Sequence, residues 1–295
     1  MIRKIKWHIN QWRNTRKRSR LEAEFNELIR KRNGLLYDFP TTSPLTIIEQ
    51  FEREGVEVER HAIDYDAFAE WEKQTYGKDF PNYYKDLHQK KCLEHYLSFE
   101  LLELKGSEVL MDVASAISKM PDVAKKHYGI KKVYRQDLLN EPGVNGEIIG
   151  SNAADVPLPA ESIDAMTLHN SFEHFENKAD EGFIREASRL LRPGGKVCII
   201  PLFLSSQPYV GTSTAEMLRE ERIPDFDEDA AVICNTKSKE HEYPIFSRHY
   251  DPSTLGSRIL RHAKNSFSTR IIHFEDSRNL LSCPFCLFLT KKKSV

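Results

Sequence analysis

The sequence predicts an α/β protein with a doubly wound, mostly parallel sheet, an antiparallel last strand and a helical N-terminal extension. From Gly106 onward, short apolar segments alternate with helical ones, which is typical of a parallel sheet covered on both faces. Before Gly106 the chain contains helical patterns alone, and near its end two apolar segments follow each other directly. We therefore expect a helical extension over residues 1–106 and an α/β domain over residues 107–295.

The composition is that of a globular protein with one large core. A chain of 295 residues is long enough for such a core with added segments. It is 40% hydrophobic and 29% charged, and its formal net charge of −1 disfavours a global electrostatic grip on nucleic acid. No apolar run reaches the roughly 18–20 residues of a membrane-spanning helix, and the basic N-terminus lacks the apolar stretch of a secretory signal. We expect a cytoplasmic protein.

The five cysteines favour reduced thiols over a disulfide framework, because they lie in apolar or helical contexts. Cys283 and Cys286 have the spacing of a redox motif, but they open an apolar strand, so we interpret them as core residues. The sequence has no second pair with this spacing, and His241, His249 and His262 are widely separated. It therefore predicts no metal site.

Residues 1–34 are strongly basic, with eleven Lys and Arg against three Glu. The apolar residues that recur at helical spacing in this segment are Ile2, Ile5, Ile9 and Trp12. They predict a basic amphipathic helix that packs on its own domain or on a second subunit, or that lies on the inner face of a membrane through residues 1–20. Binding to nucleic acid is disfavoured, because no recognisable motif accompanies the charge. A homo-oligomer and peripheral membrane contact both stay open.

Three more helices are expected in the extension. The first begins at Ser43-Pro44, a cap followed by a helix-starting proline, and ends near Gly55. The other two cover residues 64–76 and 82–105, and the last of them carries one stripe of leucines.

The α/β domain begins with five predicted strands. They are Glu108–Val113, Lys132–Gln136, Glu147–Gly150, Ile163–Leu168 and Lys196–Pro201. A helix from about Asp180 to Leu191 precedes the last strand, and the turn Arg192-Pro193-Gly194-Gly195 closes that helix.

Residues 205–249 are rich in charge and turn formers. A segment of this length between sheet elements is either a functional lid or a disordered excursion. Regular order returns with a helix that begins at Asp251-Pro252, and strands at 269–274 and 284–290 are expected to form an antiparallel pair.

Five segments carry a family resemblance. They are VLMDVASAIS (109–118), VYRQD (133–137), GSNAADVPLP (150–159), SIDAMTLHNSFEHF (162–175) and LRPGGKVCIIPL (191–202). In this order and spacing they resemble the class I S-adenosylmethionine-dependent methyltransferases, which implies S-adenosylmethionine as the cofactor and transfer of its methyl group. The MDVAS and HNSFEHF variants also resemble methyltransferase-like proteins of surface-polysaccharide pathways, which implies O-methylation of a carbohydrate or another polar small molecule.

In this family the first strand ends in an acidic residue and a glycine-rich turn, because the cofactor lies almost against the backbone there. The resemblance places Asp112 at the strand end and Ala114, Ser115 and Ala116 where glycine is expected. Small side chains allow the same approach if no position needs a positive φ, which would be costly for them. The alternative is a non-catalytic interaction protein that keeps the fold but has lost the cofactor.

Two further cofactor contacts follow from the resemblance. Asp137 ends the second strand, where the family places a carboxylate that accepts hydrogen bonds from the ribose hydroxyls. The alternative for Asp137 is an aspartate of the strand-end turn. Asn152, followed by Ala153, stands where an aspartate usually faces the adenine amino group, and its amide oxygen can accept the same bond.

Transfer to a hydroxyl benefits from a base, and the segment after the fourth strand offers His169, Glu173 and His174. This segment lies at the carboxyl edge of the sheet, where open α/β folds bind ligands. The alternatives are that Glu173 caps or pairs on the following helix and that each histidine bonds internally. Asn170-Ser171-Phe172 differs from the Asn/Asp-Pro-Pro-Tyr loop of amino-group methylases of nucleic acids, which disfavours a DNA base as the acceptor.

Overall fold

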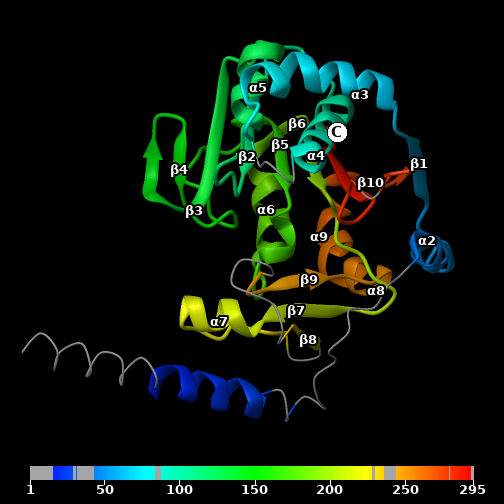
Figure 1. Cartoon of the computed structure of the whole chain (residues 1–295). Coiled ribbons are helices and arrows are strands. Elements are labelled where there is room, and N and C mark those ends of the chain that lie inside the picture. Colours follow the sequence, from blue (N-terminus) through cyan, green and yellow to red (C-terminus); the bar gives the residue numbers. More distant parts are fainter. Residues whose placement is uncertain are drawn as a thin grey trace, which may run out of the picture.

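A computed structural model describes residues 16–28, 31, 43–83, 88–227, 230–235, 244–278 and 280–293. Its main sheet has eight strands in the order β1-β10-β11-β6-β5-β2-β3-β4 (Figure 1). Their bounds are β1 Val58–Ala62, β2 Val109–Val113, β3 Lys132–Asn145, β4 Ile148–Gly150, β5 Ile163–His169, β6 Leu191–Ile200, β10 Phe267–Glu275 and β11 Phe285–Lys291. Strands β2, β3, β5 and β6 run parallel, and β11 is antiparallel to both of its neighbours. The predicted fold class is confirmed.

Helices cover both faces of this sheet. They are α2 Pro44–Arg53, α3 Tyr65–Glu72, η1 Lys73–Gly77, α4 His88–Leu102, α5 Met120–Tyr128, α6 Ala179–Leu190 and the continuous run of α8 Pro252–Leu255, η4 Gly256–Leu260 and α9 Arg261–Ala263.

The core lies on the two faces of the central strands, because successive side chains of a strand point in opposite directions. Met111 and Met166 pack on one face in a cluster with residues of α6 and α8, whereas Leu110 and Ala165 pack on the other with residues of α4 and α5. This double burial explains why β2 and β5 are apolar along most of their length.

The extension contains a strand that the sequence did not predict. Strand β1 pairs in parallel with β10 and so adds an eighth strand at the edge of the sheet. Its sequence, Val-Glu-Arg-His-Ala, is largely polar because the strand lies at the edge and none of its residues is fully buried. Helices α2, α3 with η1, and α4 account for the three helices expected in this part of the chain.

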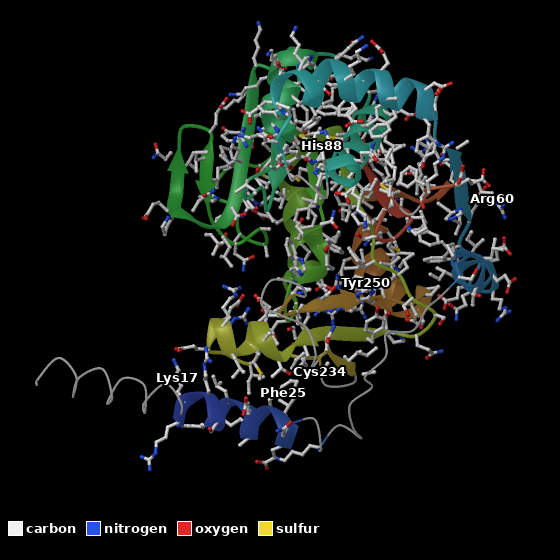
Figure 2. All side chains as sticks on the ribbon, in the orientation of Figure 1. Lys17, Phe25, Arg60, His88, Cys234 and Tyr250 are labelled. Carbon is white, nitrogen blue, oxygen red and sulfur yellow. The ribbon has the colours of Figure 1, made fainter. Side chains whose placement is uncertain are left out.

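A helix over residues 16–28 packs on another part of the same chain. Phe25 is 3% exposed and belongs to a small apolar cluster with Met217, Val232 and Cys234. Figure 2 shows Phe25 and Cys234 facing each other across this contact. The described part of the basic segment therefore packs on its own domain. The stripe of Ile2, Ile5, Ile9 and Trp12 lies outside the described residues, so its proposed membrane contact stays a prediction.

The described residues of the segment 205–249 form a second, three-stranded sheet in the order β8-β7-β9 (Figure 1). Its elements are β7 Tyr209–Ser213, α7 Thr214–Glu220, β8 Ala231–Asn235 and β9 Ser247–His249. Asp180, fully buried at the start of α6, accepts hydrogen bonds from Arg248 and Tyr250 at the end of this segment and from Arg258. These contacts fasten the small sheet to the core. Among the described residues no helix is long and apolar enough to cross a membrane.

Strand β3 extends well beyond the predicted Gln136 because the chain turns back along β4. Arg135–Asp137 lie opposite Ile148–Gly150, and Val144 and Asn145 then lie opposite Ile149 and Ile148 in the reverse direction. Strand β4 is thus enclosed between two parts of one strand. A Cβ atom at Gly150 would collide with the backbone carbonyl of Glu141, so this turn requires glycine at that position.

We expect Gly150→Ala to destabilise the protein by about 1–3 kcal/mol, because the hairpin backbone must move to make room for the methyl group. Gly256→Ala is the matched control, since the nearest atom to its added Cβ would be a side-chain oxygen of Glu54 at 3.9 Å. Thermal unfolding of both variants tests this. Equal melting temperatures for Gly150→Ala and the unmodified protein would contradict the required close approach.

Candidate functional site

The predicted cofactor turn and one of the predicted bases, His169, meet at the carboxyl ends of β2 and β5. A small cavity of about 90 Å³ lies there, whereas Glu173 and His174 do not line it. Its lining residues are Tyr83, Lys91, His95, Asp112, Val113, Ala114, Ser115, Ala116, Ser118, His169 and Asn170. A second, more open hollow of about 590 Å³ shares Tyr83, Ala116 and Ser118 with it and extends to Asp79 and Arg135. Both hollows are thus lined in part by the turn that follows β2.

The turn keeps a backbone conformation that favours glycine although it contains alanines. Ala114 has a φ of 51° and Ala116 a φ of 41°, both in the left-handed region. The condition that no position needs a positive φ is therefore not met. Hydrogen bonds from the Ala114 amide to Gln136 Oε1 (3.2 Å) and from the Ala116 amide to Asp137 Oδ2 (2.8 Å) hold the turn in this shape. The strain is stored at the wall of the cavity.

Asp112 is the polar centre of the site and is 1% exposed. It accepts hydrogen bonds from the Ser115 hydroxyl and the Thr167 hydroxyl, each at 2.8 Å, and its Oδ1 lies 3.6 Å from Nδ1 of His169. Burial alone would raise the pKa of Asp112, but these partners lower it below its ordinary value. The carboxylate therefore stays charged and joins β2, the turn and β5.

The two other predicted cofactor contacts differ in position. Asp137 is 8% exposed, and both of its oxygens accept backbone N–H groups, from Ala116 at 2.8 Å and from Leu139 at 2.9 Å. Asn152 accepts from the amide of Ala154 at 2.9 Å and lines a separate hollow beside α6. Ala153 is buried in the core and does not line the cavity. The ribose and adenine roles stay predictions.

His169 is enclosed by other polar side chains. Its Nε2 lies 2.8 Å from the Ser98 hydroxyl, and its ring packs edge-on against His95 with 4.4 Å between the ring centroids. Both ring nitrogens thus face protein groups, Ser98 on one side and Asp112 on the other. This arrangement orients the ring and leaves it poorly placed to take a proton from an acceptor.

Glu173 and His174 form a pair on the short helix η3, Phe172–His174. His174 Nδ1 donates to the carbonyl of Phe246 at 2.7 Å, and its Nε2 lies 3.5 Å from Oε1 of Glu173. Glu173 is 4% exposed and its Oε2 has no hydrogen-bond partner. Burial raises the pKa of Glu173, and His174 opposes that rise only in part. The carboxyl group is therefore a stronger base than an exposed glutamate.

Unpartnered polar atoms gather in this segment. Of the eight buried side-chain nitrogen and oxygen atoms without a hydrogen bond in the described part of the chain, four lie within residues 169–173. They are Nδ1 of His169, Nδ2 of Asn170, Oγ of Ser171 and Oε2 of Glu173. Buried polar groups are normally satisfied, so this concentration indicates a place where a polar ligand completes the bonding.

Sequence reasoning missed the contribution of α4. Lys91 and His95 line the cavity and Ser98 holds His169, although this helix lies in the part of the chain interpreted as an extension. Burial, followed by the neighbouring His169, lowers the pKa of His95 well below its ordinary value, so its ring is neutral. The spacing of residues 91, 95 and 98 places them on one helix face, and this polar face beside the leucine stripe was the available signal.

With this geometry, the strand order is that of a class I methyltransferase α/β fold, which has one antiparallel strand near the edge. Residues 111–199, from β2 to β6, match the family model described as a methyltransferase domain. The cofactor that such a domain implies is S-adenosylmethionine, as the sequence predicts. No curated protein matches the chain.

Several solved structures are similar to the chain. A chain in the complex of the Haloferax volcanii Trm112 methyltransferase activator with a methyltransferase is 9% identical, with 74% of this chain and 96% of that chain covered and a TM-score of 0.46. The Burkholderia thailandensis 1,6-didemethyltoxoflavin-N1-methyltransferase, which holds S-adenosylhomocysteine, is 11% identical, with 87% and 93% covered and a TM-score of 0.41. A methyltransferase from Listeria monocytogenes is 14% identical, with 68% and 98% covered and a TM-score of 0.42.

We expect Ala116→Gly to stabilise the protein slightly, by about 0.5–1 kcal/mol, because glycine removes the strain of the positive φ. Ala160→Gly is the control: Ala160 lies in an exposed turn and is not among the residues with positive φ, so glycine there should destabilise the chain. Chemical denaturation curves compare the two. A loss of stability in Ala116→Gly equal to that in Ala160→Gly would show that the turn is not strained.

Proposed function

We propose that this protein is an S-adenosylmethionine-dependent methyltransferase that methylates a hydroxyl group of a carbohydrate or another polar small molecule. The observation that carries the proposal is the group of four unpartnered polar atoms within residues 169–173, of which His169 and Asn170 line the cavity at the turn after β2. An apolar acceptor would leave these atoms unsatisfied, whereas an acceptor with several hydroxyl groups supplies both donors and acceptors.

The residues around the cavity fit the amino-acid end of the cofactor. The turn brings backbone close to the cavity with only methyl and hydroxymethyl side chains, and Lys91, which is paired with Glu94 at 3.2 Å, places a cation at the cavity wall. A volume of about 90 Å³ takes only part of such a molecule, and the adjoining hollow of about 590 Å³ offers room for more. When bound, S-adenosylmethionine supplies an electrophilic methyl group on a sulfonium.

Glu173 is the base in this proposal, because it combines a free oxygen, burial and a raised pKa. Its Oε2 takes the proton of the acceptor hydroxyl as the oxygen forms its bond to the methyl carbon. His174 orients the other oxygen of Glu173, and its side chain is 43% exposed, so it can pass the proton on to water. His169, held by Ser98 and Asp112, positions the acceptor.

The small sheet forms the outer wall of the acceptor site in this proposal. Phe246, which directly precedes β9, accepts the hydrogen bond of His174, and Arg248 in β9 donates to Asp180 and to the carbonyl of Phe175. A change in the small sheet would therefore alter Glu173 through His174. We keep residues 205–249 as a lid that closes over the acceptor.

Calorimetry with S-adenosylhomocysteine tests cofactor binding. We expect the unmodified protein to bind it and Asp137→Ala to bind it roughly five- to a hundred-fold more weakly, because the Ala116 amide loses its acceptor and the turn loosens. Glu52→Ala, on the exposed side of α2, is the control. An unmodified protein that does not bind would instead be the non-catalytic interaction protein that shares this fold.

We expect Glu173→Gln to lower the rate of methyl transfer to a polyhydroxyl acceptor by roughly 10²–10⁴-fold without loss of cofactor binding, because only the base is removed. The same change should raise the melting temperature near neutral pH. A carboxyl group whose pKa is raised on folding holds its proton more tightly in the folded state, so its buried charge destabilises the fold at high pH.

The stability gain of Glu173→Gln should shrink as the pH falls toward about 4.3, where the carboxyl group is protonated in the folded chain and begins to be so in the unfolded chain. Melting temperatures measured across this pH range check the sign. Glu52→Gln serves as the control, since Glu52 is exposed. A gain that stays constant with pH would remove Glu173 as a buried, charged base.

A further inference from the structure

We propose that Glu72, His88 and Cys92 form a zinc site that joins the end of α3 to the first turns of α4. The three side chains come from two helices, and each offers one atom of a type that binds zinc: a carboxylate oxygen, an imidazole nitrogen and a sulfur. Figure 2 marks His88 in the half of the molecule away from the small sheet, so this site is separate from the acceptor wall described above.

The distances suit a tetrahedral metal ion. Nε2 of His88 lies 3.0 Å from Oε1 of Glu72 and 3.6 Å from Sγ of Cys92, and all three atoms lie within 4.8 Å of one another. Bond lengths of about 2.0–2.3 Å to zinc at tetrahedral angles place such atoms about 3.3–3.6 Å apart. The two distances from His88 are close to this range, and the glutamate side chain can adjust its distance to Cys92 to seat the ion.

The helix spacing produces the convergence. His88 and Cys92 are four residues apart on α4, so their side chains lie one above the other on the same face. Glu72 is the last residue of α3 and approaches that face from the neighbouring helix. The His-x-x-x-Cys pattern is visible in the sequence, but the third ligand becomes apparent only once α3 lies against α4.

The ring nitrogen of His88 that would not bind zinc has a hydrogen-bond partner of its own. Its Nδ1 lies 2.9 Å from the backbone carbonyl of Tyr83 and donates a hydrogen bond to it. This bond fixes the ring orientation and leaves Nε2 to face Glu72 and Cys92. Histidines that bind metals commonly donate their other ring nitrogen to a carbonyl or carboxylate in this manner.

The surroundings favour zinc over harder cations. Cys92 is fully buried, and the side chains of Glu72 and His88 are about one-fifth exposed. A sulfur and an imidazole select zinc and related transition metals over magnesium or calcium. A thiolate, a carboxylate and a neutral imidazole balance the two charges of the ion. Binding displaces the thiol proton of Cys92 and any proton on Nε2 of His88 into water. Water fills the fourth position.

The bound ion would fix the flank of the candidate active site. Lys91 and His95, which line the cavity, lie on the same helix as His88 and Cys92, and the carbonyl partner Tyr83 lines the cavity too. A metal that clamps α3 to α4 therefore holds these cavity residues in place. The zinc site does not rest on the proposed transfer reaction, because its test reads metal and not activity.

Metal binding is measured on the full-length chain, free of any affinity tag and treated with a chelator. Calorimetry with Zn²⁺ alone should show one site per chain, and Co²⁺ should give the charge-transfer absorption of a cobalt–thiolate bond. Cys92→Ser should abolish that absorption and weaken zinc binding by at least a hundred-fold. Glu72→Gln, at a partly exposed position where the fold is expected to persist, should weaken it at least tenfold.

His127→Asn is the matched control. His127 also pairs with a carboxylate, Asp79, at 2.8 Å, and no cysteine stands in the candidate cluster there. Its zinc affinity should equal that of the unmodified protein, and zinc should raise the melting temperature of both but not of Cys92→Ser. Zinc bound as well by Cys92→Ser and Glu72→Gln as by the unmodified protein would place the ion elsewhere, and no binding by the unmodified protein would leave only the contact between His88 and Glu72. Either result would overturn the proposal.

Discussion

The buried carboxylate of Asp112 is the interaction on which the rest of the site depends. It lies at the end of β2 with almost no exposure, and it is satisfied by the hydroxyls of Ser115 and Thr167 and by the nearby ring of His169. A buried charge of this kind is tolerated only when its partners are well placed. Asp112 thereby fixes the turn after β2 on one side and the end of β5 on the other. The candidate cofactor turn and the segment that begins at His169 are thus held in a fixed relative position.

The alanine turn shows how a motif can keep its shape after losing its usual residues. Ala114 and Ala116 adopt positive φ values that glycine would adopt without strain, and the hydrogen bonds that their amides donate to Gln136 and Asp137 compensate for that strain. Asp137 is therefore engaged with the backbone of the turn before any ligand arrives. The alanine turn is less flexible than a glycine turn and is already held in one conformation. This favours binding if that conformation is the one that the ligand requires.

The alternation of strands and helices could be predicted from the sequence because buried parallel strands such as β2 and β5 are apolar on both faces. Strand β1 could not be predicted in the same way, since its polar residues gain their place only from pairing with β10. The small sheet could not be predicted from the sequence for a related reason. Its strands are short, and its attachment depends on long-range bonds from Arg248 and Tyr250 to Asp180.

The sequence identifies three candidate bases, but it does not show which of them is available to accept a proton. Residue type alone favoured a histidine, because its ordinary pKa lies near cellular pH. The contacts reverse that preference, since His169 is held between Ser98 and Asp112 while Glu173 keeps a free oxygen in a buried setting. Pattern reasoning identifies groups that can titrate, whereas burial and the partners of each atom decide which one is available.

The small sheet and the proposed base, Glu173, are connected through His174. The carbonyl of Phe246 holds His174, which faces Glu173, while the neighbouring Arg248 is anchored on Asp180 at the start of α6. Phe246 and Arg248, two positions apart in one segment, thus contact the two ends of the connection between η3 and α6. A displacement of the small sheet would therefore release His174 and change the environment of Glu173 together. If Glu173 is the base that we propose, it would be fully oriented only when the small sheet is in place, and the position of the sheet would then be coupled to the chemistry.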